Sequence, residues 1–167
     1  PNHHFGSLYN GDRAGSRYYL VMNRITNSAA DVDITKNHTS GSWSPGFTSE
    51  ANAYMLNLFS QFKGLEFFGT YETMSGTSLA GSPVDVSQWA AEGIYRFGSD
   101  RQFYGGLRYN RAWNKNDQSV TRFQAAAGWQ MIDNILLKLE YVNQDYNKFI
   151  SLYGADAGFN GVMVEAA

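Results

Sequence analysis

The sequence predicts an all-β protein, an antiparallel up-and-down β-barrel with about eight strands in this chain. Apolar and polar residues alternate with a period of two in one segment after another, whereas helical periodicity is scarce. Most segments are longer than strands of soluble proteins, which average about 5–6 residues. Long polar connections also alternate with short ones. The candidate strands are 16–25, 49–62, 65–73, 86–97, 102–112, 119–131, 134–145 and 159–167.

The two ends of the chain set the expected domain boundaries. Residues 1–15 ("PNHHFGSLYNGDRAG") lack a strand pattern and are predicted to be an N-terminal arm or loop. Residues 16–167 are predicted to form the barrel. The chain stops within an alternating segment, "GVMVEAA", so we expect the last strand to be truncated at its C-terminal end.

In the middle of the five clearest strands, all charged residues fall on one face. The odd-numbered residues of 65–71, 89–97, 103–109, 123–131 and 135–141 form a face without any charge. The opposite face of the same strands carries Glu66, Glu72, Glu92, Arg96, Arg108, Arg122, Lys138 and Glu140. Such alternation does not reveal which face points outward, because a soluble ligand-binding barrel also alternates, with its apolar face inside.

Two observations predict that the apolar face points outward, toward lipid. The first is that the long connections 26–48, 73–85, 112–119 and 145–159 alternate with short ones at 63–64, 98–101 and 132–134. Outer-membrane barrels have long extracellular loops and short periplasmic turns. The strands are also long enough to cross a bilayer, which takes about 9–11 residues.

The second observation is the position of the aromatic residues on the apolar face. Near the long-loop end this face has Tyr71, Trp89, Tyr109, Phe123 and Tyr141; near the short-turn end it has Phe97, Phe103 and Trp129. Glycine and alanine occupy much of the space between. Two aromatic girdles around an apolar band are typical of a barrel in a bilayer, because amphipathic rings favour the headgroup level.

The pattern resembles a Gram-negative outer-membrane β-barrel protein. The ending "GFNGVMVEAA" resembles the C-terminal strand of that class, although the aromatic residue that usually closes the strand is missing. Tyrosine- and glycine-rich strands with charged lumen positions are most similar to porin-type proteins. The resemblance implies a location in the bacterial outer membrane, with lipid around the barrel. The residues predicted to line the lumen are Glu66, Gln88, Glu92, Arg96, Arg108, Arg122, Gln124, Lys138, Glu140 and Glu165.

The number of strands leaves two architectures open. Eight strands can close alone, which gives a narrow interior filled by side chains and buried ion pairs. Alternatively, the chain is the C-terminal part of a larger barrel, and the same residues line water. Cations and anions are equally frequent on the polar face of the five clear strands, which favours pairing and argues against strong ion selectivity.

No motif in the sequence predicts catalysis, a cofactor or a metal site. The net charge of −2 gives no reason to expect a nucleic-acid partner, and cysteine is absent. His3 and His4 are interpreted as part of a solvated terminus, and His38 has no partner at a diagnostic spacing. Asp31 and Asp33 are too short a motif for a calcium loop.

The sequence therefore predicts a porin-like barrel for passive transport of small solutes, not an enzyme. The alternative is a small plugged structural or interaction barrel whose long loops bind a partner or a surface. Besides lipid, other envelope proteins or further copies of the chain are candidate partners.

Overall fold

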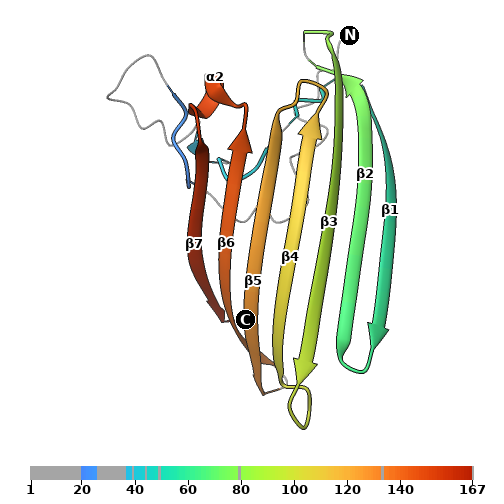
Figure 1. Cartoon of the computed structure of the whole chain (residues 1–167), viewed down its shortest axis with the longest axis vertical. Helices are drawn as coiled ribbons and strands as arrows, with labels where there is room; N and C mark the ends of the chain where they lie inside the picture. The colour runs from blue at the N-terminus through green and yellow to red at the C-terminus, as the bar shows by residue number, and fades with distance from the viewer. Residues whose placement is uncertain are drawn as a thin grey trace.

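The protein forms one seven-stranded antiparallel sheet (Figure 1). The computed structural model describes residues 20–25, 37–38, 40–43, 45–48, 50–78, 80–132 and 134–166. A short helix, α2, spans Ile150–Tyr153. The strands are β1 (Glu50–Phe62), β2 (Leu65–Thr77), β3 (Pro83–Phe97), β4 (Phe103–Asn114), β5 (Ser119–Ile132), β6 (Ile135–Asn147) and β7 (Ala157–Ala166).

Each strand pairs with its sequence neighbours, in the order β1-β2-β3-β4-β5-β6-β7. The all-β, antiparallel, up-and-down arrangement predicted from the alternation is therefore confirmed. Closure is not: over the described part of the chain, β1 pairs only with β2, and β7 only with β6. The sheet is open, and the expected eight-stranded barrel is corrected to seven strands that are not closed into a barrel.

The missing strand is the one predicted at 16–25. Residues 16–19 lie outside the described part, and residues 20–25 form no strand. Their backbone amides instead bond to residues 37–40: Met22 N–H donates to Ser40 Oγ at 3.1 Å and Arg24 N–H to Asn37 Oδ1 at 3.0 Å. Side-chain oxygens of Ser and Asn compete with a sheet for backbone donors in this way, so this apolar stretch does not join the sheet.

The connections lie at two ends of the sheet. At the end that we call the upper end, residues 78–82, 115–118 and 148–156 connect the strands; at the lower end, 63–64, 98–102 and 133–134 do so. The expected alternation of long and short connections is thus much weaker in the structure. Its cause is that β2, β3 and β4 extend further toward the upper end than predicted.

The tightest connection is the lower turn between β1 and β2. Its two residues, Lys63 and Gly64, have φ values of 47° and 88°. Positive φ at both central positions is typical of the type I′ hairpin turn, which matches the twist of the strands. A Cβ atom on Gly64 would lie 2.7 Å from the carbonyl oxygen of Arg96, so a side chain does not fit at this turn.

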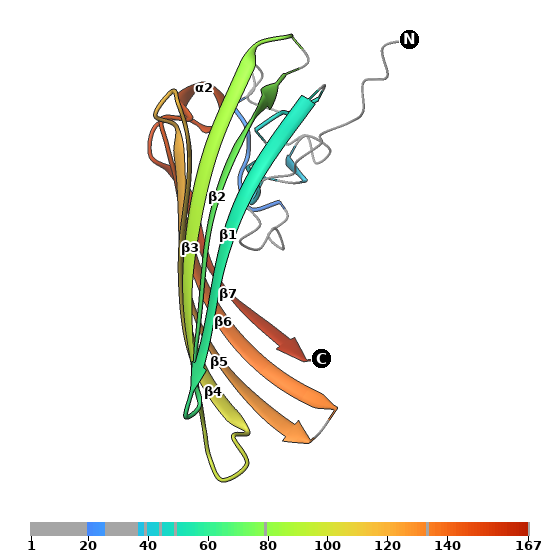
Figure 2. The same ribbon diagram turned by 90° about the vertical axis from the view of Figure 1, so that its right-hand side faces the viewer.

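The sheet is curved, and a polypeptide segment lies against its concave side (Figure 2). We call residues 40–43 and 45–48 the inner segment, and the sheet face it contacts the inner face. Phe47 is fully buried against Met74 and Val86. A Cβ atom on Gly76 would lie 2.8 Å from the Phe47 ring, so this ring requires a glycine beneath it. A second cluster joins Val120, Tyr146 and Phe149, with Trp43 packed against it.

Candidate functional site

The structure places the predicted lumen residues on the inner face. Cross-strand register puts Glu72 opposite Gln88, Glu92 opposite Arg108 and Arg108 opposite Gln124. Further along the sheet, Lys138 lies opposite Glu165. The ten predicted residues are Glu66, Gln88, Glu92, Arg96, Arg108, Arg122, Gln124, Lys138, Glu140 and Glu165, and they share this face with Glu72. That they line a water-filled lumen stays a prediction.

Ion pairs join these residues between β2 and β3, between β3 and β4, and within β6. Arg96 Nε lies 2.9 Å from Glu66 Oε1, and Arg108 Nη1 lies 3.2 Å from Glu92 Oε2. Lys138 pairs with Glu140. The side chains of Arg108 and Glu92 are 26% and 29% exposed, so this pair is partly hydrated. The equal number of cations and anions predicted pairing, and these contacts agree with it.

Hydrogen bonds add further polar contacts to these ion pairs, and together the residues form a polar row across the inner face. Gln124 Nε2 donates to Glu140 Oε1 at 2.8 Å. At the lower end, Gln61 Nε2 donates to Glu66 Oε1 at 3.1 Å, and the Arg96 guanidinium lies 5.5 Å from the centroid of the Tyr104 ring. Because cations and anions lie next to each other in this row, their charges largely cancel.

Nearer the upper end, a buried polar cluster holds the inner segment. Arg122 Nη2 and Gln144 Nε2 both donate to the carbonyl oxygen of Gly41 at 3.1 Å. The Tyr146 hydroxyl donates to the Ser40 carbonyl at 2.9 Å, and Arg122 also donates to Gln144 Oε1. Arg122 and Gln144 are completely buried. A buried guanidinium needs such acceptors, because an unpaired buried charge is very costly.

A buried amide next to this cluster has no hydrogen-bond partner among the described residues. Asn110 lies directly opposite Arg122 in the sheet and is 1% exposed. Neither its side-chain nitrogen nor its side-chain oxygen makes a hydrogen bond within the described part of the protein. Gln88 donates to Glu72 Oε2 at 2.5 Å nearby on the same face. The upper half of the inner face is therefore rich in polar groups that are shielded by the inner segment.

The outer face is the opposite of the inner face in chemistry. Its large apolar side chains are exposed, for example Leu107 at 58% and Val162 at 68%. Its only charged residues within the strands lie close to the strand ends. Exposed apolar area of this extent marks a contact with lipid or with another protein.

The outer face carries both predicted aromatic groups. The upper group comprises Tyr71, Trp89, Tyr109, Phe123 and Tyr141, with Trp89 and Tyr109 ring centroids 5.3 Å apart. The lower group comprises Phe97, Phe103 and Trp129, whose rings stack in sequence at 5.7 and 5.9 Å. Direct cross-strand pairing of these three residues produces the lower row. Their role as membrane girdles stays a prediction.

Sequence reasoning missed the inner segment and the residues that hold it. Gln144 and Tyr146 lie on the polar face of β6, beyond or at the end of the predicted strand, and their partners Ser40 and Gly41 are about a hundred positions away. No short-range pattern reports such a contact. Phe47 lay in a segment predicted to be a long polar loop.

The described residues contain no group of three His, Cys, Asp or Glu side chains that could hold a metal ion. His3, His4, Asp31 and Asp33 lie outside the described residues. No helix in the described part of the chain is long and apolar enough to cross a membrane.

Comparison with protein-family models, with curated proteins and with solved structures finds no match for this chain.

Proposed function

We propose that this chain is a bacterial outer-membrane β-barrel protein of porin type that allows passive passage of small solutes along its inner face. The observation that carries the proposal is the separation of charge between the two faces. In the middle of strands β2 to β6, the inner face holds the ion pairs, and the outer face holds exposed, uncharged apolar residues between two aromatic groups. A bilayer requires this separation, since a charge at mid-depth on the lipid face costs about 2–4 kcal/mol.

The inner segment suggests how such a path is narrowed. It crosses the inner face near the upper end, where Arg122 and Gln144 hold the Gly41 carbonyl. If the chain transports solutes, they pass between this segment and the polar row that contains Arg108 and Glu92. Because that row is internally paired, small polar solutes of either charge are the expected cargo.

The second candidate is a plugged interaction barrel whose upper loops bind a partner or surface. It is favoured by the complete burial of Arg122 and Gln144 under the inner segment. Because these side chains are inaccessible to water, the contact between the inner segment and the sheet leaves no space for a solute at this point. In this case, the connections at the upper end would carry the function.

Conductance in planar lipid bilayers separates the two candidates. The full chain is folded in detergent, inserted into the bilayer and recorded at fixed voltage in potassium chloride. Stable, stepwise openings support transport. A silent bilayer, with insertion verified independently by protease protection, supports the plugged barrel and contradicts the transport proposal.

A further inference from the structure

A polar pocket lies on the outer face at the upper end of β4, β5 and β6. Its volume is about 480 Å³. The residues that matter for its chemistry are Arg111, Trp113, Asp117, Ser119, Asn147 and Lys148. Arg111 and Trp113 follow Tyr109 on the outer face of β4, so the pocket begins just beyond the upper aromatic group.

This position corresponds to a defined depth if the outer face lies in lipid. Tyr109 and Phe123 are cross-strand partners in the upper aromatic group, and Arg111 pairs with Thr121 one step higher. A strand rises about 3.3 Å per residue, so Arg111 lies about 7 Å above Tyr109. Aromatic girdles mark the headgroup level of a bilayer, which places the pocket among the headgroups and their phosphates.

The side chains in the pocket suit an anion that carries oxygen acceptors. Arg111 is exposed and makes no ion pair within the described part of the chain; its guanidinium lies 5.9 Å from the centroid of the Trp113 ring. Lys148 Nζ lies 3.1 Å from Asp117 Oδ2. Two cations thus face one carboxylate in the pocket. A guanidinium presents a planar fork of donors that matches phosphate oxygens.

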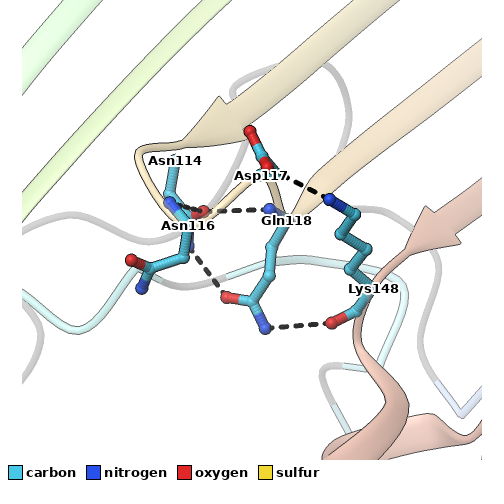
Figure 3. A network of polar contacts seen from close by, with 5 residues as sticks. All are labelled: Asn114, Asn116, Asp117, Gln118 and Lys148. Atoms are coloured by element: carbon cyan, nitrogen blue, oxygen red, sulfur yellow. Dashed lines mark hydrogen bonds and ion pairs between the residues drawn. The ribbon is translucent and has the colours of Figure 1, made fainter.

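Hydrogen bonds hold the rim of the pocket in place (Figure 3). Asn114 Oδ1 accepts from the backbone N–H groups of Asn116 and Gln118 at 2.9 and 3.1 Å. Gln118 Nε2 donates to the carbonyl oxygen of Lys148 at 3.3 Å. The turn between β4 and β5 is thereby tied to the residue that follows β6, so Lys148 is positioned before any ligand arrives.

We propose that this pocket binds the phosphate group of an anionic membrane lipid, and that it disfavours a zwitterionic headgroup, in which a cation accompanies the phosphate. The Arg111 guanidinium donates to the phosphate oxygens from one side, and the Lys148 ammonium contributes from the rim. Asp117 opposes binding, because its carboxylate competes with the phosphate for Lys148. Asp145 is the nearest other carboxylate in the same row of the sheet, two strands from Arg111. The proposal rests on the lipid-facing placement in the proposed function.

The test measures which lipids the full chain retains. The chain is folded in detergent with equal amounts of phosphatidic acid and phosphatidylcholine, and native mass spectrometry counts the lipids of each kind that remain bound. We expect phosphatidic acid to be retained in preference. Arg111→Gln should lower this preference about fivefold, because one cation near an anionic lipid surface raises the binding affinity by about this factor.

Two further variants make the test specific. Asp117→Asn should raise the preference for phosphatidic acid, because it removes the competing carboxylate; asparagine also tolerates the positive φ of 59° at this position. Lys115→Gln is the control: Lys115 lies in the same turn but pairs with Asp85 at 3.1 Å, outside the pocket. Equal losses for Lys115→Gln and Arg111→Gln would show a diffuse charge effect and overturn the site.

The remaining outcomes separate this inference from the proposed function. Retention of both lipids without preference overturns the headgroup site alone. A chain that retains neither lipid and stays dispersed without detergent contradicts the lipid-facing placement, and the site with it. If inorganic phosphate displaces phosphatidic acid completely, the pocket is a site for free phosphate, and the lipid proposal fails.

Discussion

Phe47 shows how a single side chain fixes the position of a segment that has no strand partner. Its ring is completely buried against Met74 and Val86, on two neighbouring strands. Gly76 leaves the space that the ring occupies. The hydrogen bonds from Arg122 and Gln144 to the Gly41 carbonyl fix the other, N-terminal end of the inner segment. Apolar burial and polar contacts thus act at different points of the inner segment.

Replacing Phe47 with alanine should release the inner segment from the sheet. Truncation of a buried phenylalanine costs about 3–5 kcal/mol, and few other apolar contacts hold this end of the segment. Limited proteolysis of the detergent-folded protein should then cut within residues 40–48. The control is Phe62→Ala, since Phe62 is 68% exposed on β1. Similar protection of the segment in both variants would contradict this account.

Two neighbouring alanines of β5 have side chains on opposite faces of the sheet. Ala127 lies on the outer face between Gly105 and Leu139, and Ala126 lies on the inner face opposite Glu140. Ala127→Lys should lower the free energy of unfolding of the vesicle-folded protein by about 2–4 kcal/mol. Ala126→Lys places the same charge beside a carboxylate and should cost much less. Urea titration of vesicle-folded protein measures both; equal costs would reject the face assignment.

At the scale of the strands, the ion pair between Glu92 and Arg108 links β3 and β4 directly. The two residues face each other in the register, with 3.2 Å between their charged atoms. Both remain partly exposed, so the net worth of the pair for stability is small. Its balance of charge matters more for the proposed transport function, because each partner cancels the electric field that the other would impose on the proposed solute path.

Removal of either partner should therefore shift ion preference in opposite directions. Glu92→Gln leaves Arg108 unbalanced and should favour anions, whereas Arg108→Gln leaves Glu92 unbalanced and should favour cations. The reversal potential across a bilayer with a potassium chloride gradient measures the preference. Shifts of the same sign in both variants would show that the pair does not face the conducting path.

Sequence alternation predicted the strands well where one face is consistently apolar, from Leu65 to Tyr141. It placed the end of β2 too early, at Thr73, because the small polar residues up to Thr77 give no clear period. These residues still form a strand, since both Glu50 of β1 and Pro83 of β3 offer pairing partners to Thr77. The residue at which a strand ends therefore depends on the pairing partners in adjacent strands, which the local sequence does not reveal.

The candidate site was predictable in composition but not in its contacts. Alternation puts Glu92 and Arg108 on one face, but only the register makes them partners. The predicted strand at 16–25 was wrong over residues 20–25, because the oxygens of Asn37 and Ser40 take the backbone donors of that stretch. Contacts of this kind depend on where a distant segment folds back.

At the scale of the whole molecule, the outer face determines how the protein behaves in solution. Exposed residues such as Leu107, Leu139 and Val164 form a continuous apolar surface across several strands. An exposed apolar surface of this size causes a protein to aggregate in water unless lipid, detergent or another protein covers it. The outer edges of β1 and β7 have no strand partner among the described residues, and unpaired strand edges promote association.

The purified chain should therefore require detergent to remain dispersed. Sedimentation velocity should show a single species with bound detergent above the critical micelle concentration, and large aggregates when detergent is removed. A stable monomer in plain buffer would contradict lipid exposure of the outer face.

The two edge strands of the described sheet, β1 and β7, point in the same direction (Figure 1). Joining them directly, or joining β7 of one copy to β1 of another in a ring, would create a parallel seam in an otherwise antiparallel wall. Pairing like edges of two copies restores antiparallel neighbours but turns one copy upside down. A closed barrel in which every strand is antiparallel to both neighbours has an even number of strands. With all copies in the same orientation, such a barrel therefore needs an odd number of additional strands between β7 and β1.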